Sequence, residues 1–326
     1  MDFEIKSFCK ENHLNSQNVS RVITKNRNVY GLVNVLNERM TVTITNGQKF
    51  YVGDFVEYMI FEGEVYIRQS LPRKNIISKA YNTTQKAYNT TQIEEQVLAT
   101  NVDQLFILIA ADQRFTLSKF ERYVLVFSGM SEDVHVLITK SDFTKETDLI
   151  LKQIRSVYPQ LRVIAYSIYN EESLKNVYQL IKEEKTAILV GASGAGKSSL
   201  VNNLLGRDDI STRKVRRDGK GKHTTTSSQL YYVKKTNSYL IDSPGFKGIE
   251  TSREINTAVL FEEIENLSLR CKFNDCKHQS EPGCAIKNAI KDGDLEETLF
   301  ERYLLQTKKR KAYEQYLEEK NRKKKH

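Results

Sequence analysis

Apolar and polar positions alternate between residues 20 and 70, in short runs that turn residues interrupt. The runs RVITKNRNVYGLVNV, MTVTITNG, KFYVGDFVEYMI and GEVYIRQSL are rich in β-branched and aromatic residues. Several short strands at this spacing predict a small barrel or sandwich. A five-stranded oligonucleotide-binding (OB) barrel over residues 1–72 fits the length, and an SH3-like barrel is the structural alternative.

Residues 73–97 show no apolar period. The polar heptad KAYNTTQ occurs there twice in tandem, at 79–85 and 86–92. Chains tolerate such a duplication where extra length costs little, so we expect a linker or loop. Its cations Arg73, Lys74 and Lys79 are candidates for contact with a phosphate backbone.

From residue 98 to 268, apolar strand-like runs alternate with helical stretches, as in NVDQLFILIAA, LSKFERYVLVFSG and DVHVLITKSD. This alternation predicts a parallel sheet with crossover helices. Ligands of such sheets bind at the carboxyl ends of the strands. The nucleotide motifs of this chain all follow predicted strands.

A phosphate-binding loop follows the predicted strand TAILV and opens a helix. Its glycines let backbone N–H groups wrap phosphates, while Lys197 reaches the outer phosphates and Ser198 ligates Mg²⁺. The residues expected to bind the nucleotide here are Gly191, Ala192, Ser193, Gly194, Ala195, Gly196, Lys197, Ser198 and Ser199.

The motif Asp242-Ser-Pro-Gly245 follows the predicted strand NSYLID. Asp242 is the carboxylate that such proteins place near Mg²⁺, and Gly245 can bend towards the γ-phosphate. Between this motif and the phosphate loop lies the polar segment RDDISTRKVRRDGKGKHTTT, which we expect to be a mobile switch. One threonine of its Thr-Thr-Thr run is expected to join Ser198 on Mg²⁺; a threonine-rich strand start is the alternative.

A guanine-recognition motif, Thr139-Lys140-Ser141-Asp142, follows the predicted strand HVLI. The carboxylate of Asp142 can accept hydrogen bonds from the guanine ring N–H and exocyclic amine, and the stem of Lys140 can cover the base. Adenine lacks that donor pair, so the motif favours GTP over ATP. Ser167 ends the next predicted strand, and we expect it to close the base pocket.

The guanine motif precedes the phosphate loop, which reverses the usual order of GTP-binding proteins. A doubly wound domain tolerates cutting one surface loop and joining the old termini when those ends lie close. We therefore predict a complete but circularly permuted set of motifs.

A cysteine cluster near the C-terminus has the spacing Cys271-x₄-Cys276-x-His278-x₅-Cys284. In a reducing cytoplasm such a cluster indicates metal ligation before disulfides. Three thiolates and an imidazole suit a tetrahedral structural zinc ion with no open position for catalysis. Buried free cysteines are the alternative. Cys9 is left over, and we expect it to be inert.

Basic residues outnumber acidic ones, 50 to 41, which gives a formal charge of +9 and a pI near 9.1. This excess and the basic tail KNRKKKH suit a polyanionic partner such as RNA; ordinary solvated surface is the alternative. No apolar run approaches the roughly 18 residues of a membrane span. The N-terminus lacks a secretion signal, so we expect a soluble cytoplasmic protein.

The motifs TKSD, GASGAGKSS, GKHTTT, DSPGF and CKFNDCKHQSEPGC, in this order, resemble the ribosome small subunit-dependent GTPase A family of bacterial, circularly permuted GTPases. The resemblance implies a multidomain fold: an N-terminal OB barrel, a central α/β phosphate-loop GTPase domain and a C-terminal zinc-binding helical domain over residues 269–326. It also implies GTP hydrolysis with Mg²⁺, one structural zinc ion, and a role in late maturation of the small ribosomal subunit, which stimulates hydrolysis.

By matching position, the resemblance makes Thr225 the switch threonine and His223 the residue that orients the attacking water. Phe246 supports this assignment, because many GTPases have a glutamine after Asp-x-x-Gly and phenylalanine cannot hydrogen-bond water. We expect a monomer that binds the small subunit and its rRNA, with other assembly factors as further candidate partners. The alternative is a GTP-gated RNA-binding module whose hydrolysis is incidental.

Overall fold

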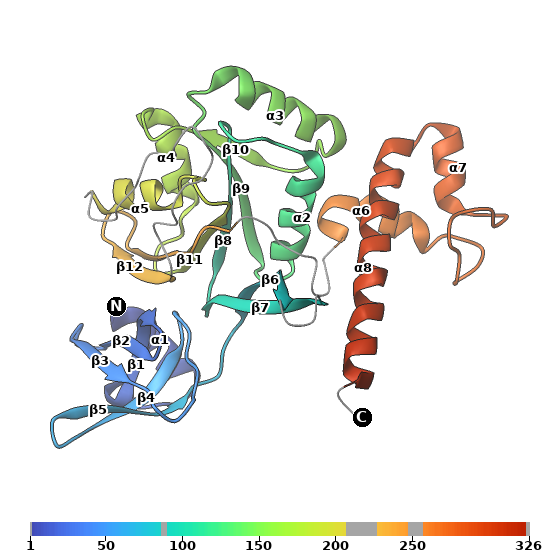
Figure 1. Cartoon of the computed structure of the whole chain (residues 1–326). Helices are drawn as coiled ribbons and strands as arrows, with labels where there is room; N and C mark the ends of the chain where they lie inside the picture. The colour runs from blue at the N-terminus through green and yellow to red at the C-terminus, as the bar shows by residue number, and fades with distance from the viewer. Residues whose placement is uncertain (1, 86–89, 207–226, 247–256, 324–326) are drawn as a thin grey trace.

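The chain is organised around one large twisted sheet (Figure 1). A computed structural model describes residues 2–85, 90–206, 227–246 and 257–323 of the 326-residue chain. The sheet order is β10-β9-β8-β11-β13-β12-β1-β2-β3, with β4 and β5 attached through β1. Its strands are β1 (Val19–Asn26), β2 (Val29–Asn34), β3 (Arg39–Thr43), β4 (Phe55–Phe61), β5 (Glu64–Ser70), β8 (Gln104–Ala110), β9 (Asp133–Thr139), β10 (Val163–Tyr166), β11 (Thr186–Gly191), β12 (Gln229–Val233) and β13 (Ser238–Asp242).

The N-terminal part of the chain is β-rich, as the alternating pattern predicts. Helix α1 (Asp2–Glu11) and a short 3₁₀ turn (Ser16–Asn18) precede strands β1 to β5. All pairings among these strands are antiparallel: β1 with β2 and β4, β2 with β3, and β4 with β5. Because successive side chains point to opposite faces, Val22, Leu32 and Val56 meet in a small core of their own.

The structure has a two-stranded antiparallel ribbon where we expected a linker over residues 73–97. Its strands are β6 (Ile76–Gln85) and β7 (Thr90–Thr100), and the first copy of the heptad lies within β6. We predicted a linker because the segment has no apolar period. Threonine and tyrosine favour extended backbone even where such a period is absent. The ribbon is anchored at its base, where Ile77 and Leu98 are buried in the main core.

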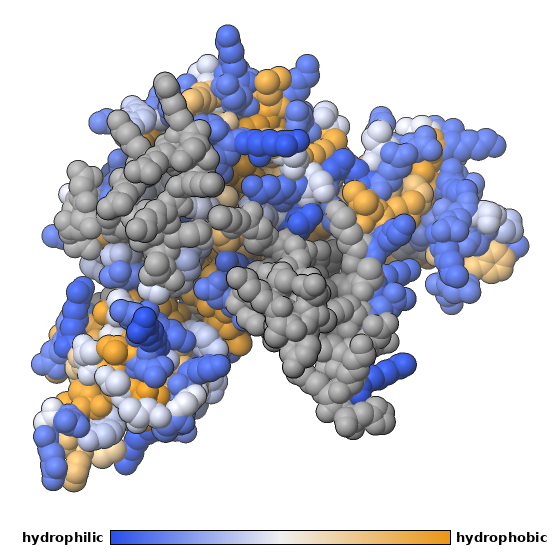
Figure 2. Space-filling view, viewed as in Figure 1, coloured by the Kyte–Doolittle hydropathy of each residue, from blue (hydrophilic) through white to orange (hydrophobic). Residues whose placement is uncertain are grey.

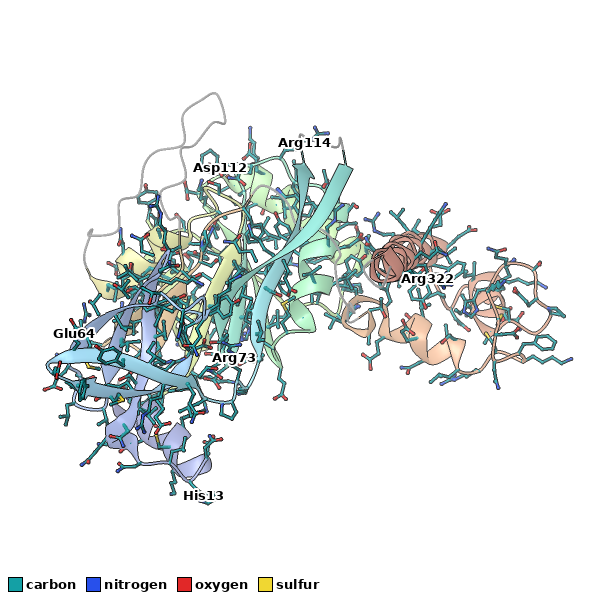
Figure 3. All side chains as sticks on the ribbon, turned by 60° about the horizontal axis from the view of Figure 1, so that its bottom comes forward. His13, Glu64, Arg73, Asp112, Arg114 and Arg322 are labelled. Atoms are coloured by element: carbon teal, nitrogen blue, oxygen red, sulfur yellow. The ribbon has the colours of Figure 1, made fainter. Side chains whose placement is uncertain are left out.

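The three cations that we considered for RNA contact in this segment are paired with carboxylates or buried within the protein. Arg73 binds the carboxylate of Asp54 through two hydrogen bonds of 2.6 and 2.8 Å, and Lys74 pairs with Asp103 at 2.9 Å. Lys79 is buried. Figure 3 shows Arg73 at the base of the ribbon, where it meets the N-terminal strands.

The central part is a doubly wound α/β domain, as predicted. Strands β10, β9, β8, β11 and β13 are parallel, and β12 is antiparallel to β13. Strand β8 is buried on both faces: Leu105 and Ile107 belong to one core, Phe106 and Leu108 to another. Helices α2 (Leu117–Ser128) and α3 (Thr144–Val157) cover the first face, and α4 (Glu171–Leu180) and α5 (Lys197–Leu205) cover the second.

The C-terminal helices pack on α2 through a buried carboxylate. Glu121 of α2 accepts hydrogen bonds from the Tyr158 hydroxyl at 2.5 Å and the Gln306 amide at 2.9 Å, and it pairs with Arg302. Arg302 and Gln306 lie on α8, so this network holds α8 against the GTPase core. The helices of this part are α6 (Ala258–Ser268), α7 (Ala285–Asp292) and α8 (Glu297–Lys323).

Among the residues coloured by hydropathy in Figure 2, hydrophilic ones predominate, and hydrophobic ones form several separate areas. Among the described residues, none of the helices combines the length and the apolar character needed to cross a membrane.

Candidate nucleotide site and metal centre

The phosphate loop connects β11 to α5 at the carboxyl edge of the parallel sheet. A side chain at Gly191 would place its Cβ 2.5 Å from the carbonyl oxygen of Leu108, so only glycine allows the two backbones to approach. Gly196 precedes α5 with a φ of +87°, a left-handed conformation that glycine adopts without strain. The loop therefore leads directly into the N-terminus of α5, whose free N–H groups favour anions.

Lys197 is held inside this loop. Its ammonium donates hydrogen bonds of 3.0 Å to the carbonyl oxygens of Gly191 and Ala192, and the side chain is only 5% exposed. Burial lowers the pKa of Lys197 to about 8, against the opposing attraction of Asp242. The loop thus encloses a cation whose charge is costly without an anionic partner.

The Asp-x-x-Gly segment closes on the phosphate loop. The Ser198 hydroxyl donates a 2.7 Å hydrogen bond to the carboxylate of Asp242, so the two groups expected near Mg²⁺ lie side by side. A Cβ on Gly245 would lie 2.7 Å from the Cα of Ser193 and 3.2 Å from the Lys197 ammonium. Only a glycine therefore permits this close approach to the loop.

The guanine motif meets the phosphate loop directly. The hydroxyl of Thr139, which ends β9, donates a 2.9 Å hydrogen bond to the carbonyl oxygen of Ala195. Both residues are almost fully buried, at 2% and 1% exposure. Two motifs that stand in reversed order along the chain therefore share one edge of the sheet.

Asp142 has a hydrogen-bond partner at this edge of the sheet. The Ser167 hydroxyl donates a 2.6 Å hydrogen bond to its carboxylate, and the backbone N–H of Ser141 donates to the carbonyl oxygen of Tyr166 at 3.1 Å. The loop after β10 is thereby held against the guanine motif. The structure thus places Ser167 beside Asp142, and its role in closing the base pocket stays a prediction.

Sequence reasoning missed two residues that follow β8. Asp112 pairs with the Lys140 ammonium at 2.6 Å, and the Gln113 amide donates to the carbonyl oxygen of Ser193 at 2.9 Å. Lys140 itself has a φ of +61°. Figure 3 shows Asp112 with Arg114 at one end of the domain, distant from Glu64 on the β4–β5 hairpin. The signal available was position alone, because both residues follow the carboxyl end of a predicted parallel strand.

The residue after Gly245 is buried against α2. The ring of Phe246 is 2% exposed and packs on Tyr123 and Phe127 of α2, with centroid distances of 5.6 and 6.1 Å. Its backbone bridges to Ala192 of the phosphate loop. The candidate switch residues His223 and Thr225 lie outside the described residues.

The cysteine cluster converges in space. The ligand atoms of Cys271, Cys276, His278 and Cys284 all lie within 4.8 Å of one another. The His278 Nδ1 is 3.6 Å from the Cys271 sulfur and 3.5 Å from the Cys284 sulfur, which are 4.0 Å apart. Tetrahedral zinc with Zn–S bonds of about 2.3 Å requires ligand separations of this size. The four residues therefore fit one zinc ion.

These observations define a class of protein. A phosphate loop, an adjacent hydroxyl–carboxylate pair and a carboxylate of the guanine motif lie along one edge of a doubly wound sheet. They belong to a phosphate-loop GTP-binding protein whose motifs are circularly permuted.

Comparison with known proteins identifies the family. A family model described as RsgA GTPase matches residues 70–252, and the chain belongs to this family of GTPases. The Small ribosomal subunit biogenesis GTPase RsgA 1 of Oceanobacillus iheyensis is 34% identical over 259 residues, which cover 78% of this chain and 71% of that protein. RsgA 2 of Vibrio vulnificus is 31% identical over 296 residues, covering 90% and 81%.

Solved structures show the same fold. YjeQ from Thermotoga maritima matches with a TM-score of 0.61 and 24% identity, over 89% of this chain and 96% of that one. YloQ, described as a circularly permuted GTPase, matches with a TM-score of 0.59 and 22% identity, over 90% and 95%. The permuted order predicted from the sequence is therefore confirmed.

Proposed function

We propose that this GTPase binds the small ribosomal subunit and assists its late maturation, with slow intrinsic hydrolysis that the subunit stimulates. The observation that supports nucleotide binding most directly is the hydrogen bond from Thr139 to Ala195, which joins base recognition to phosphate recognition. The relatives named as small ribosomal subunit biogenesis GTPases support the choice of partner.

Within the site, Asp142 binds the guanine base, and Ser167 holds that carboxylate in place. Lys197 and the backbone of the phosphate loop bind the phosphates. Ser198 and Thr225 are the proposed ligands of a Mg²⁺ ion, which neutralises charge on the phosphates when it is bound. His223 orients the attacking water, because Phe246, which stands where many GTPases have a glutamine, is buried and cannot hydrogen-bond water.

For the N-terminal region we propose an OB barrel over residues 1–72 that contacts rRNA. Its strand pairings form a three-stranded meander, β1-β2-β3, and a β4–β5 hairpin joined through β1, which fits the expected class. The hairpin carries exposed apolar side chains, with Phe61 56% and Tyr66 45% exposed. Figure 2 shows hydrophobic surface at its end. Exposed aromatic rings can stack on unpaired bases.

The proposed domain plan places the GTPase domain at residues 98–268 and a zinc-binding helical domain at 269–326. Residues 73–97, which include most of the β6–β7 ribbon, connect the barrel to the GTPase domain. One structural zinc ion bound by the cysteine cluster would hold the loop between α6 and α7 together. The basic end of α8 adds cations for rRNA phosphates.

GTP turnover with and without purified small subunits tests this function. We expect slow hydrolysis by the protein alone, acceleration by subunits, and a loss of at least about 100-fold in the stimulated rate for His223→Ala. The exposed His13, which Figure 3 shows far from Asp112, offers the control His13→Ala. Absence of stimulation at saturating subunit would remove the proposal.

The second candidate function is a GTP-gated RNA-binding module. The basic composition and the exposed aromatic hairpin favour RNA binding whether or not hydrolysis matters. Under this alternative, His223→Ala would still bind subunits in a GTP-dependent way and would restore growth to a deletion strain.

A further inference from the structure

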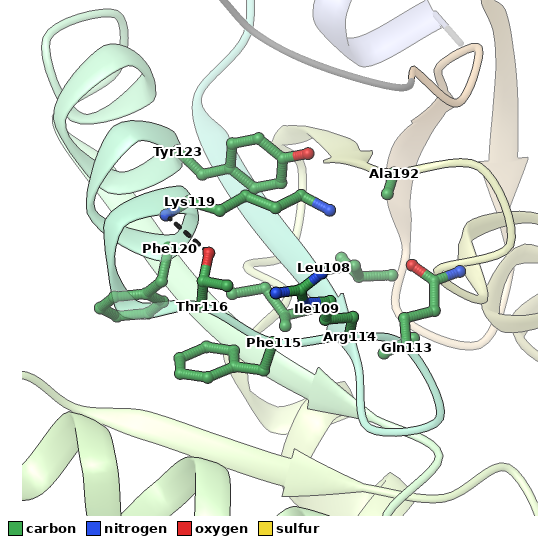
Figure 4. A pocket seen from close by; sticks show the side chains of 11 residues that line it. Leu108, Ile109, Gln113, Arg114, Phe115, Thr116, Lys119, Phe120, Tyr123 and Ala192 are labelled. Atoms are coloured by element: carbon green, nitrogen blue, oxygen red, sulfur yellow. Dashed lines mark hydrogen bonds between the residues drawn. The ribbon is translucent and has the colours of Figure 1, made fainter.

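A small basic pocket lies beside the phosphate loop, between the end of β8 and the first turns of α2 (Figure 4). None of the described residues that line it is acidic. The polar residues that line it are Gln113, Arg114, Thr116, Lys119 and Tyr123. Ala192 of the phosphate loop also lines it, and its remaining walls are apolar. The pocket is thus positively charged and has no carboxylate of its own to neutralise it.

The Tyr123 hydroxyl is the best indication that the pocket takes a polar ligand. Tyr123 is 2% exposed, and its hydroxyl has no hydrogen-bond partner among the described residues. In Figure 4 the hydroxyl is directed towards the side of the pocket where Ala192 lies. Burial raises the pKa of Tyr123 to about 12, so the group stays protonated and can donate a hydrogen bond. A buried donor of this kind requires an acceptor.

The charges around the hydroxyl specify an anionic acceptor. The Lys119 ammonium lies 5.7 Å from the centre of the Tyr123 ring, and Arg114 adds a second cation. Helix α2 begins at Leu117 beside the pocket, and Thr116 caps its first turn by accepting a hydrogen bond from the Lys119 N–H. A helix N-terminus and two cations both favour negative charge.

The position of the pocket relates it to the γ-phosphate. Ala192 belongs to the phosphate loop, and Gln113 contacts the next loop residue, Ser193, at 2.9 Å. Gly245, which is expected to bend towards the γ-phosphate, also approaches Ser193. The pocket therefore lies beside the loop that is expected to hold the phosphates. The open volume of the cavity, about 20 Å³, exceeds what a single water molecule needs and excludes a nucleotide.

We propose that this pocket binds inorganic phosphate, the second product of GTP hydrolysis, after the phosphate leaves the γ-position. That the phosphate comes from GTP depends on the proposed hydrolysis. That the pocket binds an anion depends only on the residues that line it. Tyr123 donates to a phosphate oxygen, and Lys119 and the α2 N-terminus neutralise its charge.

Titration of the GDP-loaded full-length protein with inorganic phosphate, at constant ionic strength and followed by calorimetry, tests the site. Tyr123→Phe and Lys119→Gln should each weaken phosphate binding about tenfold or more and leave GDP affinity unchanged. Tyr123→Phe removes only a hydroxyl without a partner, so the variant should fold. The control Lys152→Gln changes an exposed lysine of α3 and should bind phosphate like the wild type.

Two outcomes would overturn the proposal: no phosphate binding to the GDP-loaded wild type, or binding that both pocket variants retain in full, which would place the ion elsewhere. A fluorescent phosphate sensor, compared with quenched-flow cleavage, adds the kinetic test. Tyr123→Phe should change the delay between cleavage and release without changing cleavage. If the protein failed to hydrolyse GTP, the titration would still decide whether the anion site exists.

Discussion

Lys197 shows at the scale of single residues how burial tunes the nucleotide site. The phosphate loop encloses its ammonium, and the pKa is lowered to about 8 because charge is disfavoured away from water. The nearby charge of Lys79 lowers it further. Phosphate oxygens favour the charged form, so nucleotide binding above this pKa must take up a proton.

We therefore predict that the affinity for GDP falls as pH rises from about 7 to 9, with a midpoint near 8. The stability of the nucleotide-free protein should depend on pH in the opposite direction. Lys197 has a pKa of about 8 in the folded protein and about 10.5 in the unfolded chain, so the unfolded chain binds more protons between these values. The free energy of unfolding should therefore rise between pH 8 and 10.5. Titrations of GDP at several pH values measure the first effect. Lys79→Gln should move the midpoint upwards, and an unmoved midpoint or a flat profile would contradict the assignment.

The proposed contact of Asp142 with the guanine base gives a second prediction at the same scale. Asp142→Asn replaces an acceptor by an amide, so two charge-assisted hydrogen bonds to guanine are lost. At about 1.5–3 kcal/mol for a hydrogen bond to a charged group, GTP affinity should fall at least tenfold. Xanthosine triphosphate, which has a carbonyl where guanine has an amine, should bind better to the variant than to the wild type. Competition titrations measure both ligands, and Asp148→Asn on exposed α3 is the control.

At the scale of elements, a buried ionic network joins the N-terminal strands to the GTPase sheet. Arg21 of β1 is 1% exposed and pairs with Glu4 of α1, and its guanidinium donates to the Thr186 hydroxyl at 2.9 Å. It also donates to the carbonyl oxygens of Gly53 and Asn101. Since Thr186 begins β11, the network attaches the N-terminal unit to the strand that carries the phosphate loop.

Arg21→Met should lower the free energy of unfolding by about 3–5 kcal/mol, because it leaves the Glu4 carboxylate buried without its cation. The double variant Arg21→Met with Glu4→Gln should lose less free energy of unfolding than the two single variants lose in sum. Urea unfolding of the four proteins measures this coupling. Strict additivity would show that the pair contributes nothing to the junction.

The cysteine cluster is a second feature at this scale. If it binds zinc, the purified protein should contain about one zinc ion per chain, and Cys271→Ser should lose it. Removal of the ion should also increase hydrogen exchange in α7, which begins after Cys284. Metal analysis and exchange measurements test this. Cys9→Ala, at a buried cysteine outside the cluster, should keep its metal.

At the scale of the whole molecule, the sheet connects the nucleotide site to the N-terminal unit. Strand β12 follows the candidate switch segment in the chain, pairs with β13, and meets β1 at Thr24 and Gln229. β13 ends at Asp242 beside Ser198. A change at the switch and a contact on the N-terminal strands therefore act on the same sheet.

Under the proposed function, binding to the small subunit should depend strongly on salt, because contacts between protein cations and RNA phosphates release counterions. Replacing the exposed Lys308, Lys311 and Arg322 of α8 by Gln should weaken binding and reduce the slope of log K against log salt by roughly 0.7–0.9 per lost contact. Binding measured at several salt concentrations gives the slope. Replacing Lys145, Lys152 and Lys175 by Gln is the charge-matched control, and equal effects of both triples would indicate nonspecific attraction.

The sequence by itself determined which motifs the candidate site contains and the chemistry that they predict, because each motif is local. The loop from Gly191 to Ser198, the Asp242-to-Gly245 turn and the Thr139-to-Asp142 motif each act through neighbouring residues after a strand. The same applies to the permuted order and to the spacing of the four candidate zinc ligands. Strand and helix periods also predicted the β-rich start and the parallel sheet.

Only the tertiary structure decided which distant residues meet. The Thr139–Ala195 and Asp112–Lys140 contacts, the Arg21 network and the pocket at Tyr123 depend on the order and register of strands. Hydrophobic periodicity tells which face of a strand is buried but not which strand lies beside it. The ribbon of β6 and β7 was not predicted for a related reason: a segment with strand propensity but no apolar period resembles a linker until its partner strand is known.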